Sequence, residues 1–172
     1  MRTHVALLRG INVGGKNAVP MAALRDIFES AGAADVSTYI QSGNVIFSSS
    51  ARPAPEVYER AIADRFGVAT TVVVRTRAEL VKASGANPFP AADVSTLHVG
   101  FMLHAPAAAA VKALDVTRFA PEECAVRGRE LYLHLPNGVG RSKLAPAVDR
   151  QLRVPTTVRN WKTLTKLIEL TR

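Results

Sequence analysis

The chain has 172 residues, of which 48% are hydrophobic and 21% are charged. This balance is typical of globular proteins and excludes a disordered or fibrous chain, and the length suits one ordinary domain or two small ones. No apolar run approaches the roughly 18 residues of a membrane-spanning helix, and the single cysteine, Cys124, excludes an internal disulfide. We therefore expect a soluble, cytoplasmic protein with no membrane partner.

Positive charge is concentrated at the end of the chain. The formal net charge is +8, and residues 141–172 hold eight Lys or Arg against two acidic residues, so this segment alone contributes +6. A basic surface attracts nucleotides, phosphorylated metabolites or nucleic acid, although the same charge is also found on an ordinary solvated helix face.

In the first half, apolar periodicity alternates between the patterns of strands and helices. Pro20 opens a helix that Gly32 ends, and Ser42-Gly43 has the length and chemistry of a tight hairpin turn between two β-rich segments. The predicted elements are strand 4–9, helix 20–31, strands 36–41 and 44–48, helix 55–66 and strand 70–75.

The second half repeats this order, with a hairpin turn of the same length at Gly128-Arg129. The predicted elements are strand 97–103, helix 106–114, strands 124–127 and 130–135, helix 144–152, strand 156–158 and a closing helix 161–171. A short linker helix covers 79–83, and the prolines of Asn87–Pro90 exclude regular structure. We therefore predict domains 1–88 and 89–172, duplicated in element order without a visible repeat of residues.

The predicted fold class is α+β, with two consecutive ferredoxin-like β-α-β-β-α-β halves, a short linker helix and an extra C-terminal helix. This topology puts the loop after the first strand beside the turn between the second and third strands. Strands such as Val5–Leu8 are apolar on both sides, so a second layer should cover the sheet. The other half, a helix or another subunit are the alternatives for that layer.

The loop Gly10–Asn17 lies between a strand and a helix and nearly matches a phosphate-binding loop. Gly10, Gly15 and Lys16 fit G-x-x-x-x-G-K, in which backbone N–H groups wrap a phosphate and the lysine neutralises it. Asn17 stands where that motif needs the hydroxyl of Ser or Thr to bind Mg²⁺. We therefore predict an anion-binding loop without nucleoside triphosphatase chemistry, and the alternative is a glycine turn with no ligand.

The neighbouring turn would add polar groups to this loop. Amides and one cation suit recognition by hydrogen bonds rather than acid–base catalysis. The predicted ligand-binding residues of the first half are Asn12, Gly14, Gly15, Lys16, Asn17, Gln41, Ser42, Gly43 and Asn44. The alternative is that these residue types serve only turn conformation.

Two basic segments of the second half precede helices, whose first N–H groups attract anions. The predicted ligand-binding residues here are Arg141, Ser142, Lys143, Arg159, Asn160 and Trp161. The alternative assigns Asn160 as the N-cap of the closing helix and Trp161 as a core residue in line with Leu164 and Ile168.

The remaining candidates, a nucleophilic cysteine and a histidine metal site, have little support. Cys124 alternates with Val126 on a predicted strand and is expected to be a buried side chain rather than a nucleophile. His98, His104 and His134 are expected to share one face with Tyr132, which is an incomplete set of metal ligands. We predict no metal site, and the residues identify no catalytic group, no cofactor and no reaction, which leaves open whether the protein is an enzyme.

Several phrases resemble a bacterial family catalogued as domain of unknown function 1697. They are LLRGINVGGKN, TYIQSGNV, NPF, GRSKL and TVRNWKTL, and the resemblance covers essentially the whole chain. It implies a two-lobed fold related to ferredoxin-like units. The family has no established activity that could be transferred to this chain.

Three functions remain open from the sequence. The leading hypothesis is binding of a small phosphate- or carboxylate-bearing ligand, the second is non-specific nucleic-acid binding by the basic C-terminal segment, and the third is a homo-oligomeric interaction protein. RNA-recognition sheets stack bases on exposed aromatic side chains. Phe47 is the only aromatic on the central strands of the first half, and we expect Phe101 and Tyr132 on opposite faces of the second, which argues against this mode.

Overall fold

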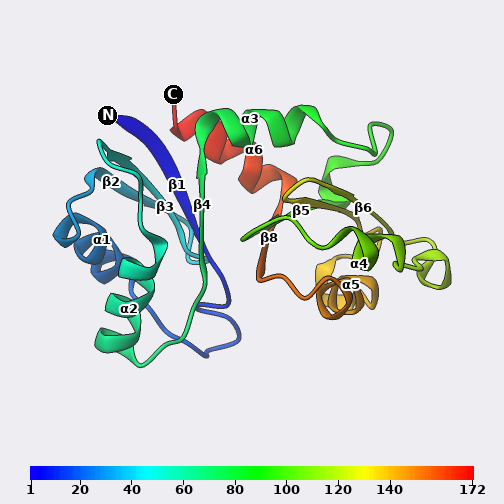
Figure 1. The fold of residues 1–172 in the computed structure, drawn as a ribbon, viewed down its shortest axis with the longest axis horizontal. Coiled ribbons are helices and arrows are strands. Elements are labelled where there is room, and N and C mark those ends of the chain that lie inside the picture. The colour runs from blue at the N-terminus through cyan, green and yellow to red at the C-terminus, as the bar shows by residue number, and fades with distance from the viewer. The chain divides into compact units, whose positions relative to one another are not determined.

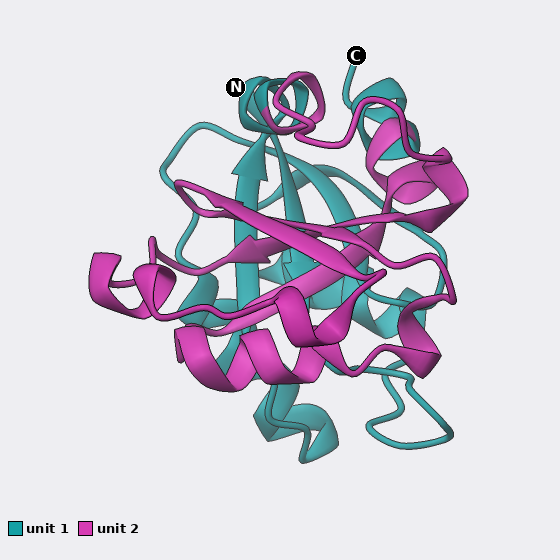
Figure 2. Ribbon diagram, turned by 90° about the vertical axis from the view of Figure 1, so that its right-hand side faces the viewer, with its two compact units in different colours: residues 1–82, 166–172 teal, residues 83–165 magenta.

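The computed structural model describes residues 1–172, which form two compact units (Figure 2). The first comprises residues 1–82 and 166–172, and the second residues 83–165. The chain passes between them within two helices, α3 (Arg77–Gly85) and α6 (Trp161–Leu170). None of the helices has both the length and the apolar character that crossing a bilayer requires.

The first unit contains a four-stranded antiparallel sheet in the order β2-β3-β1-β4. Its strands are β1 (Arg2–Leu8), β2 (Ala34–Tyr39), β3 (Asn44–Ser49) and β4 (Val72–Thr76). Helices α1 (Met21–Ser30) and α2 (Pro55–Phe66) lie on one side of this sheet (Figure 1). Pro55 begins α2 where the missing N–H costs nothing, and Gly67 ends it in a left-handed conformation.

The second unit contains a sheet of the same kind, in the order β6-β7-β5-β8. Its strands are β5 (Leu97–Met102), β6 (Glu123–Arg127), β7 (Glu130–His134) and β8 (Thr156–Asn160). Helix α5 (Leu144–Leu152) packs on one face through Leu144, Val148 and Leu152. Helix α4 (Ala108–Lys112) has only five residues, shorter than the predicted 106–114.

The molecule is therefore a mixed α+β protein with two four-stranded antiparallel sheets and six helices, which fits two similar halves. The short α4 is followed by a 3₁₀ turn at Thr117–Phe119, so the second unit departs from the first in its helices. A ferredoxin-like arrangement in every detail stays a prediction.

The two hairpins differ in length, so the predicted match between them is wrong. Tyr39 pairs with Asn44 across a four-residue connection, whereas Arg127 pairs with Glu130 across the two-residue turn Gly128-Arg129. The longer connection forms because Ile40 adopts a left-handed conformation with φ 51° instead of continuing β2. The amide Nδ2 of Asn44 then donates to the carbonyl of Tyr39 at 2.9 Å and closes the loop.

Both faces of the first sheet are buried. Ala6, Leu8 and Phe47 face α1 and α2, while Val5 and Leu7 lie on the opposite face with exposed fractions of 0%. The prediction that strands apolar on both sides would be covered on both sides is therefore confirmed.

The pairing registers reveal a repeat of residues that the linear sequence does not show. Val5 on β1 pairs with Arg75 on β4, and Val99 on β5 pairs with Arg159 on β8, with a histidine immediately before each valine. Arg75 and Arg159 are both buried, and each follows a valine that packs on the helix side of its sheet. The two arginines therefore occupy equivalent positions on the opposite face.

Equivalent helix caps follow these arginines. The hydroxyl of Thr76 accepts a hydrogen bond from the N–H of Glu79 at 3.3 Å, and the side chain of Asn160 accepts one from the N–H of Thr163 at 2.8 Å. Each satisfies a donor that the first turn of the next helix leaves unpaired. The two halves therefore share the strand register, a buried arginine and a helix cap, in addition to the order of their elements.

Candidate functional site

The predicted meeting of the glycine-lysine loop with the β2–β3 turn is confirmed. The N–H of Leu8 donates to the carbonyl of Gly43 at 2.9 Å, and the side chain of Asn12 donates to the carbonyl of Gln41 at 2.9 Å. We call this region, residues 10–17 and 40–44, the hairpin edge. It is the candidate site of the first unit.

The loop itself is a small hairpin rather than a phosphate-wrapping loop. The N–H of Asn12 donates to the carbonyl of Asn17 at 3.0 Å, and that of Lys16 donates to the carbonyl of Val13 at 2.9 Å. Gly14 and Gly15 form its tip with φ of 57° and 74°, and two consecutive positive φ values are typical of a type I′ turn. Such a turn lacks the concave ring of N–H groups with which a phosphate-binding loop surrounds its ligand.

Asn12 fixes the hairpin against the rest of the unit. Its Nδ2 donates to the carbonyls of Val19 at 3.0 Å and Gln41 at 2.9 Å, and its Oδ1 accepts from the N–H of Val19 at 2.8 Å. An asparagine also tolerates the left-handed φ of 52° found here. The side chain predicted to contact a ligand therefore holds the two turns together.

Asn17 and Asn44, two more of the predicted amides, are also engaged with the chain. The Nδ2 of Asn17 donates to the carbonyl of Gly10 at 2.9 Å, and the buried Asn44 donates to the Ser42 hydroxyl at 3.1 Å as well as to β2. The sequence alternative, in which these residue types serve turn conformation, accounts for these bonds.

Four groups of the predicted set remain exposed at the hairpin tip and the turn. Lys16 is exposed and forms no ion pair, and the N–H groups of Gly14 and Gly15 donate no hydrogen bond within the chain. Gln41 is exposed as well, next to the point where Asn12 holds its carbonyl. A cation, two N–H donors and an amide are thus present on one rigid edge.

Left-handed backbone is concentrated at this edge. Seven of the thirteen residues with positive φ belong to it: Gly10, Asn12, Gly14, Gly15, Asn17, Ile40 and Gly43. Ile40 stands out because it is a β-branched residue, for which this conformation is a genuine outlier. Strain of this kind persists where the surroundings enforce it and clusters at ligand-binding sites.

In the second unit, the start of α5 is occupied by the chain's own carboxylate. Oε2 of Glu122 accepts from the hydroxyl of Ser142 at 2.7 Å and from the N–H of Leu144 at 3.0 Å, and Ser142 in turn accepts from the N–H of Ala145 at 3.0 Å. Ser142 thus helps to cap the helix, while Arg141 and Lys143 are exposed beside it. Glu122 could not be predicted from a local pattern because it lies 22 residues before the helix start that it binds.

We expect Glu122→Ala to lower the free energy of unfolding by about 1–2 kcal/mol, because two donors at the start of α5 lose a charged acceptor. Urea denaturation followed by circular dichroism measures this change. Glu123→Ala is the matched control, since the exposed Glu123 only pairs with His134, at 3.1 Å, and should lose under about 1 kcal/mol. Equal losses in both variants would contradict the capping role of Glu122.

The second basic segment, Arg159–Trp161, does not lie at the start of α5. Arg159 is buried on the sheet face opposite α5, where its Nη1 donates to Thr157 Oγ1 at 2.6 Å, and burial lowers its pKa to about 10. Asn160 caps α6, as the sequence alternative predicted, and the half-buried Trp161 lies with its ring centroid 6.5 Å from that of Tyr132. Arg159 therefore points away from the face on which α5 begins.

The prediction that the strand histidines share one sheet face with Tyr132 is wrong. His98 pairs with Leu133, which faces α5, whereas Tyr132 and His134 point to the other side of the sheet because neighbouring residues of a strand alternate. No group of three or more His, Cys, Asp or Glu residues is arranged to hold a metal ion. Cys124 is half-buried against the core, and burial raises the pKa of its thiol to about 11, which disfavours a nucleophilic thiolate.

The central aromatic residues are packed inside the protein. Phe47 lies in the core with His4 stacked on it at 5.5 Å between ring centroids. Phe101 and Tyr132 share one sheet face, contrary to our expectation, because both alternate with residues on the α5 side. Both are buried, and the Tyr132 hydroxyl donates to the carbonyl of Ala83 at 2.7 Å. None of the three is an exposed platform for stacking bases.

The comparisons with known proteins identify the family. The chain is similar to the conserved bacterial protein SP0830 from Streptococcus pneumoniae, whose solved structure matches with a TM-score of 0.76 and 26% identity over 99% of this chain and 98% of that one. No curated protein matches it. The model of the family described as "Protein of unknown function (DUF1697)" matches residues 1–132. The chain, with its glycine-lysine hairpin fixed against the β2–β3 turn, belongs to this family of bacterial proteins of unknown function.

Proposed function

We propose that the protein binds a small phosphate- or carboxylate-bearing ligand at the hairpin edge. The observation that carries this proposal is the cluster of left-handed residues there, which includes the strained Ile40. Folding alone does not favour a β-branched residue at positive φ, so its presence supports a role for this edge beyond packing.

The exposed groups of the edge determine the charge of the ligand. Lys16 supplies a cation, and Gly14 and Gly15 supply N–H donors at the hairpin tip. Such donors bind the oxygen atoms of an anion through charge-assisted hydrogen bonds. We therefore propose binding, with no reaction assigned.

The bonded amides would act by holding these groups in place. Asn12 joins hairpin and turn through three hydrogen bonds, and Asn17 closes the hairpin on Gly10. A rigid edge loses less conformational freedom when it binds, which strengthens binding without any further contact. Asn12, Asn17 and Asn44 are thus positioning residues in this proposal.

The proposal predicts a thermal shift that depends on Lys16. Inorganic phosphate, pyrophosphate, ATP and citrate would be tested in turn, and one of them at ten times its Kd should raise the Tm by about 3–6 °C. Lys16→Ala should weaken this ligand at least about tenfold because a charged hydrogen bond is lost. Lys82→Ala, which removes an exposed lysine from α3, should respond like the wild type. Equal shifts in all three proteins, or no shift with any compound, would overturn the proposal.

A further inference from the structure

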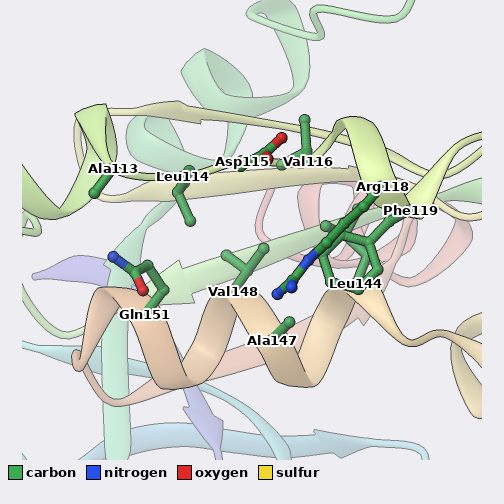
Figure 3. A pocket seen from close by; sticks show the side chains of 10 residues that line it. All are labelled: Ala113, Leu114, Asp115, Val116, Arg118, Phe119, Leu144, Ala147, Val148 and Gln151. Atoms are coloured by element: carbon green, nitrogen blue, oxygen red, sulfur yellow. The ribbon is translucent and has the colours of Figure 1, made fainter.

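A groove in the second unit lies between residues 113–119 and helix α5 (Figure 3). It encloses about 220 Å³ and lies far along the chain from the hairpin edge. None of its residues was predicted from the sequence to bind a ligand. Those that line it are Ala113, Leu114, Asp115, Val116, Arg118, Phe119, Leu144, Ala147, Val148 and Gln151.

The floor of the groove is continuous with the apolar core, whereas the surface that the groove leaves open is more polar than apolar. Leu144 and Val148 of α5 belong to the buried cluster of this unit, and Leu114, Val116 and Phe119 pack against that cluster from the other side. Leu114 points toward α5 in the close view (Figure 3). A short apolar group would therefore contact hydrocarbon at the bottom of the groove, between polar side chains at its rim.

Arg118 supplies a single cation to this groove. Its side chain extends from the 3₁₀ turn toward α5 and ends beside Val148 and Ala147 (Figure 3). The guanidinium lies 4.8 Å from the ring centroid of Phe119 and has no ion pair within the chain. A guanidinium that lies over an aromatic ring and forms no ion pair is placed to bind a carboxylate in two parallel hydrogen bonds.

Asp115 limits the charge of the ligand. Its Oδ1 accepts from the N–H of Thr117 at 3.1 Å and from the hydroxyl of Thr117 at 2.6 Å, and these bonds lower the pKa of the carboxyl, with a smaller contribution from the charge of Arg118. The carboxylate points away from α5 but remains close enough to interact with Arg118. A negative charge at the rim repels a dianion more than a monoanion.

We propose that this groove binds a small monocarboxylate with an apolar body, whose carboxylate contacts Arg118 and whose body fills the space over Val148. The volume of about 220 Å³ lies below the roughly 300–1,000 Å³ of pockets for drug-sized ligands, so the body is that of a short-chain or aromatic acid. This inference is independent of the proposed function, because it concerns other residues, and the amides that shift distinguish the groove from the hairpin edge.

Amide NMR titration with hexanoate and benzoate tests the groove directly. Both acids should shift amide signals of residues 113–119 and 144–151, with half-saturation in the millimolar range, which is usual for such small ligands. Hexanol and benzyl alcohol, which have the same bodies without the carboxylate, should bind at least about tenfold more weakly. Inorganic phosphate should leave these signals unchanged.

Three variants complete the test. Arg118→Gln should raise the half-saturation concentration of benzoate at least about tenfold, and Ala147→Phe should abolish binding because the new ring fills the groove. Arg150→Gln removes an exposed arginine of α5 that does not line the groove and should behave like the wild type. Equal affinity of Arg118→Gln and wild type, equal affinity for acid and alcohol, or shifts confined to other residues would overturn the inference.

Discussion

Gly43→Ala is expected to lower the free energy of unfolding by about 3 kcal/mol and the Tm by about 6–12 °C. Two effects combine at this residue. Its φ of 84° is strained for any residue with a Cβ, and a Cβ built there would lie 2.7 Å from Cδ1 of Ile11 and 2.9 Å from Cβ of Leu8. Ile11 and Leu8 are buried, so neither can move away freely.

Gly67→Ala separates these two effects. Gly67 ends α2 with a φ of 65°, but a Cβ at this position would meet no atom within 4 Å. Its loss should be only the conformational cost of about 1 kcal/mol. Thermal unfolding by circular dichroism measures both variants, and a Gly43 variant no less stable than the Gly67 variant would contradict the close packing of the turn on Ile11.

Asn12→Gly is expected to cost about 2 kcal/mol, the second largest effect. Glycine keeps the left-handed φ of 52° without strain, so the loss comes from the three hydrogen bonds to Val19 and Gln41. Asn12 is only half-buried and Gln41 is exposed, so water replaces some of the lost bonds. The same variant frees the hairpin from the turn and should weaken any ligand of the hairpin edge.

Asn17→Gly is the matched control, because Asn17 also has a left-handed φ, of 54°, but makes only one side-chain hydrogen bond, to Gly10. We expect it to lose under about 1 kcal/mol. Urea denaturation gives both values, and equal losses would show that Asn12 does not join hairpin and turn.

The sequence was sufficient to predict the hairpin edge because topology alone brings its two parts together. Once strands 4–9 and 44–48 are neighbours, the loop after the first and the turn before the second must share an edge, and the bonds from Leu8 to Gly43 and from Asn12 to Gln41 confirm this. Whether the asparagine side chains would bond to the chain itself or face a ligand was not predictable. Asparagine has the same donors whether it faces a ligand or a carbonyl, and only the three-dimensional distances distinguish the two.

Other features depend on contacts between residues distant in sequence. Glu122 reaches the start of α5 across more than twenty residues, and the groove brings a loop onto that helix without any local motif. The faces of Phe101 and Tyr132 depend on the exact register of β5 with β7, since a shift of one residue reverses every side chain. The repeat of Val5–Arg75 in Val99–Arg159 is likewise visible only after the strands are paired.

Amide NMR titration with pyrophosphate tests the central claim, an anion site at the hairpin edge, most directly. Pyrophosphate carries no base or sugar, so the readout depends on charge and geometry alone. We expect saturable shifts at Gly14, Gly15 and Lys16, with a half-saturation concentration that rises at least about tenfold in Lys16→Ala. Saturable shifts that leave these three amides unchanged, or that are equal in wild type and Lys16→Ala, would contradict it.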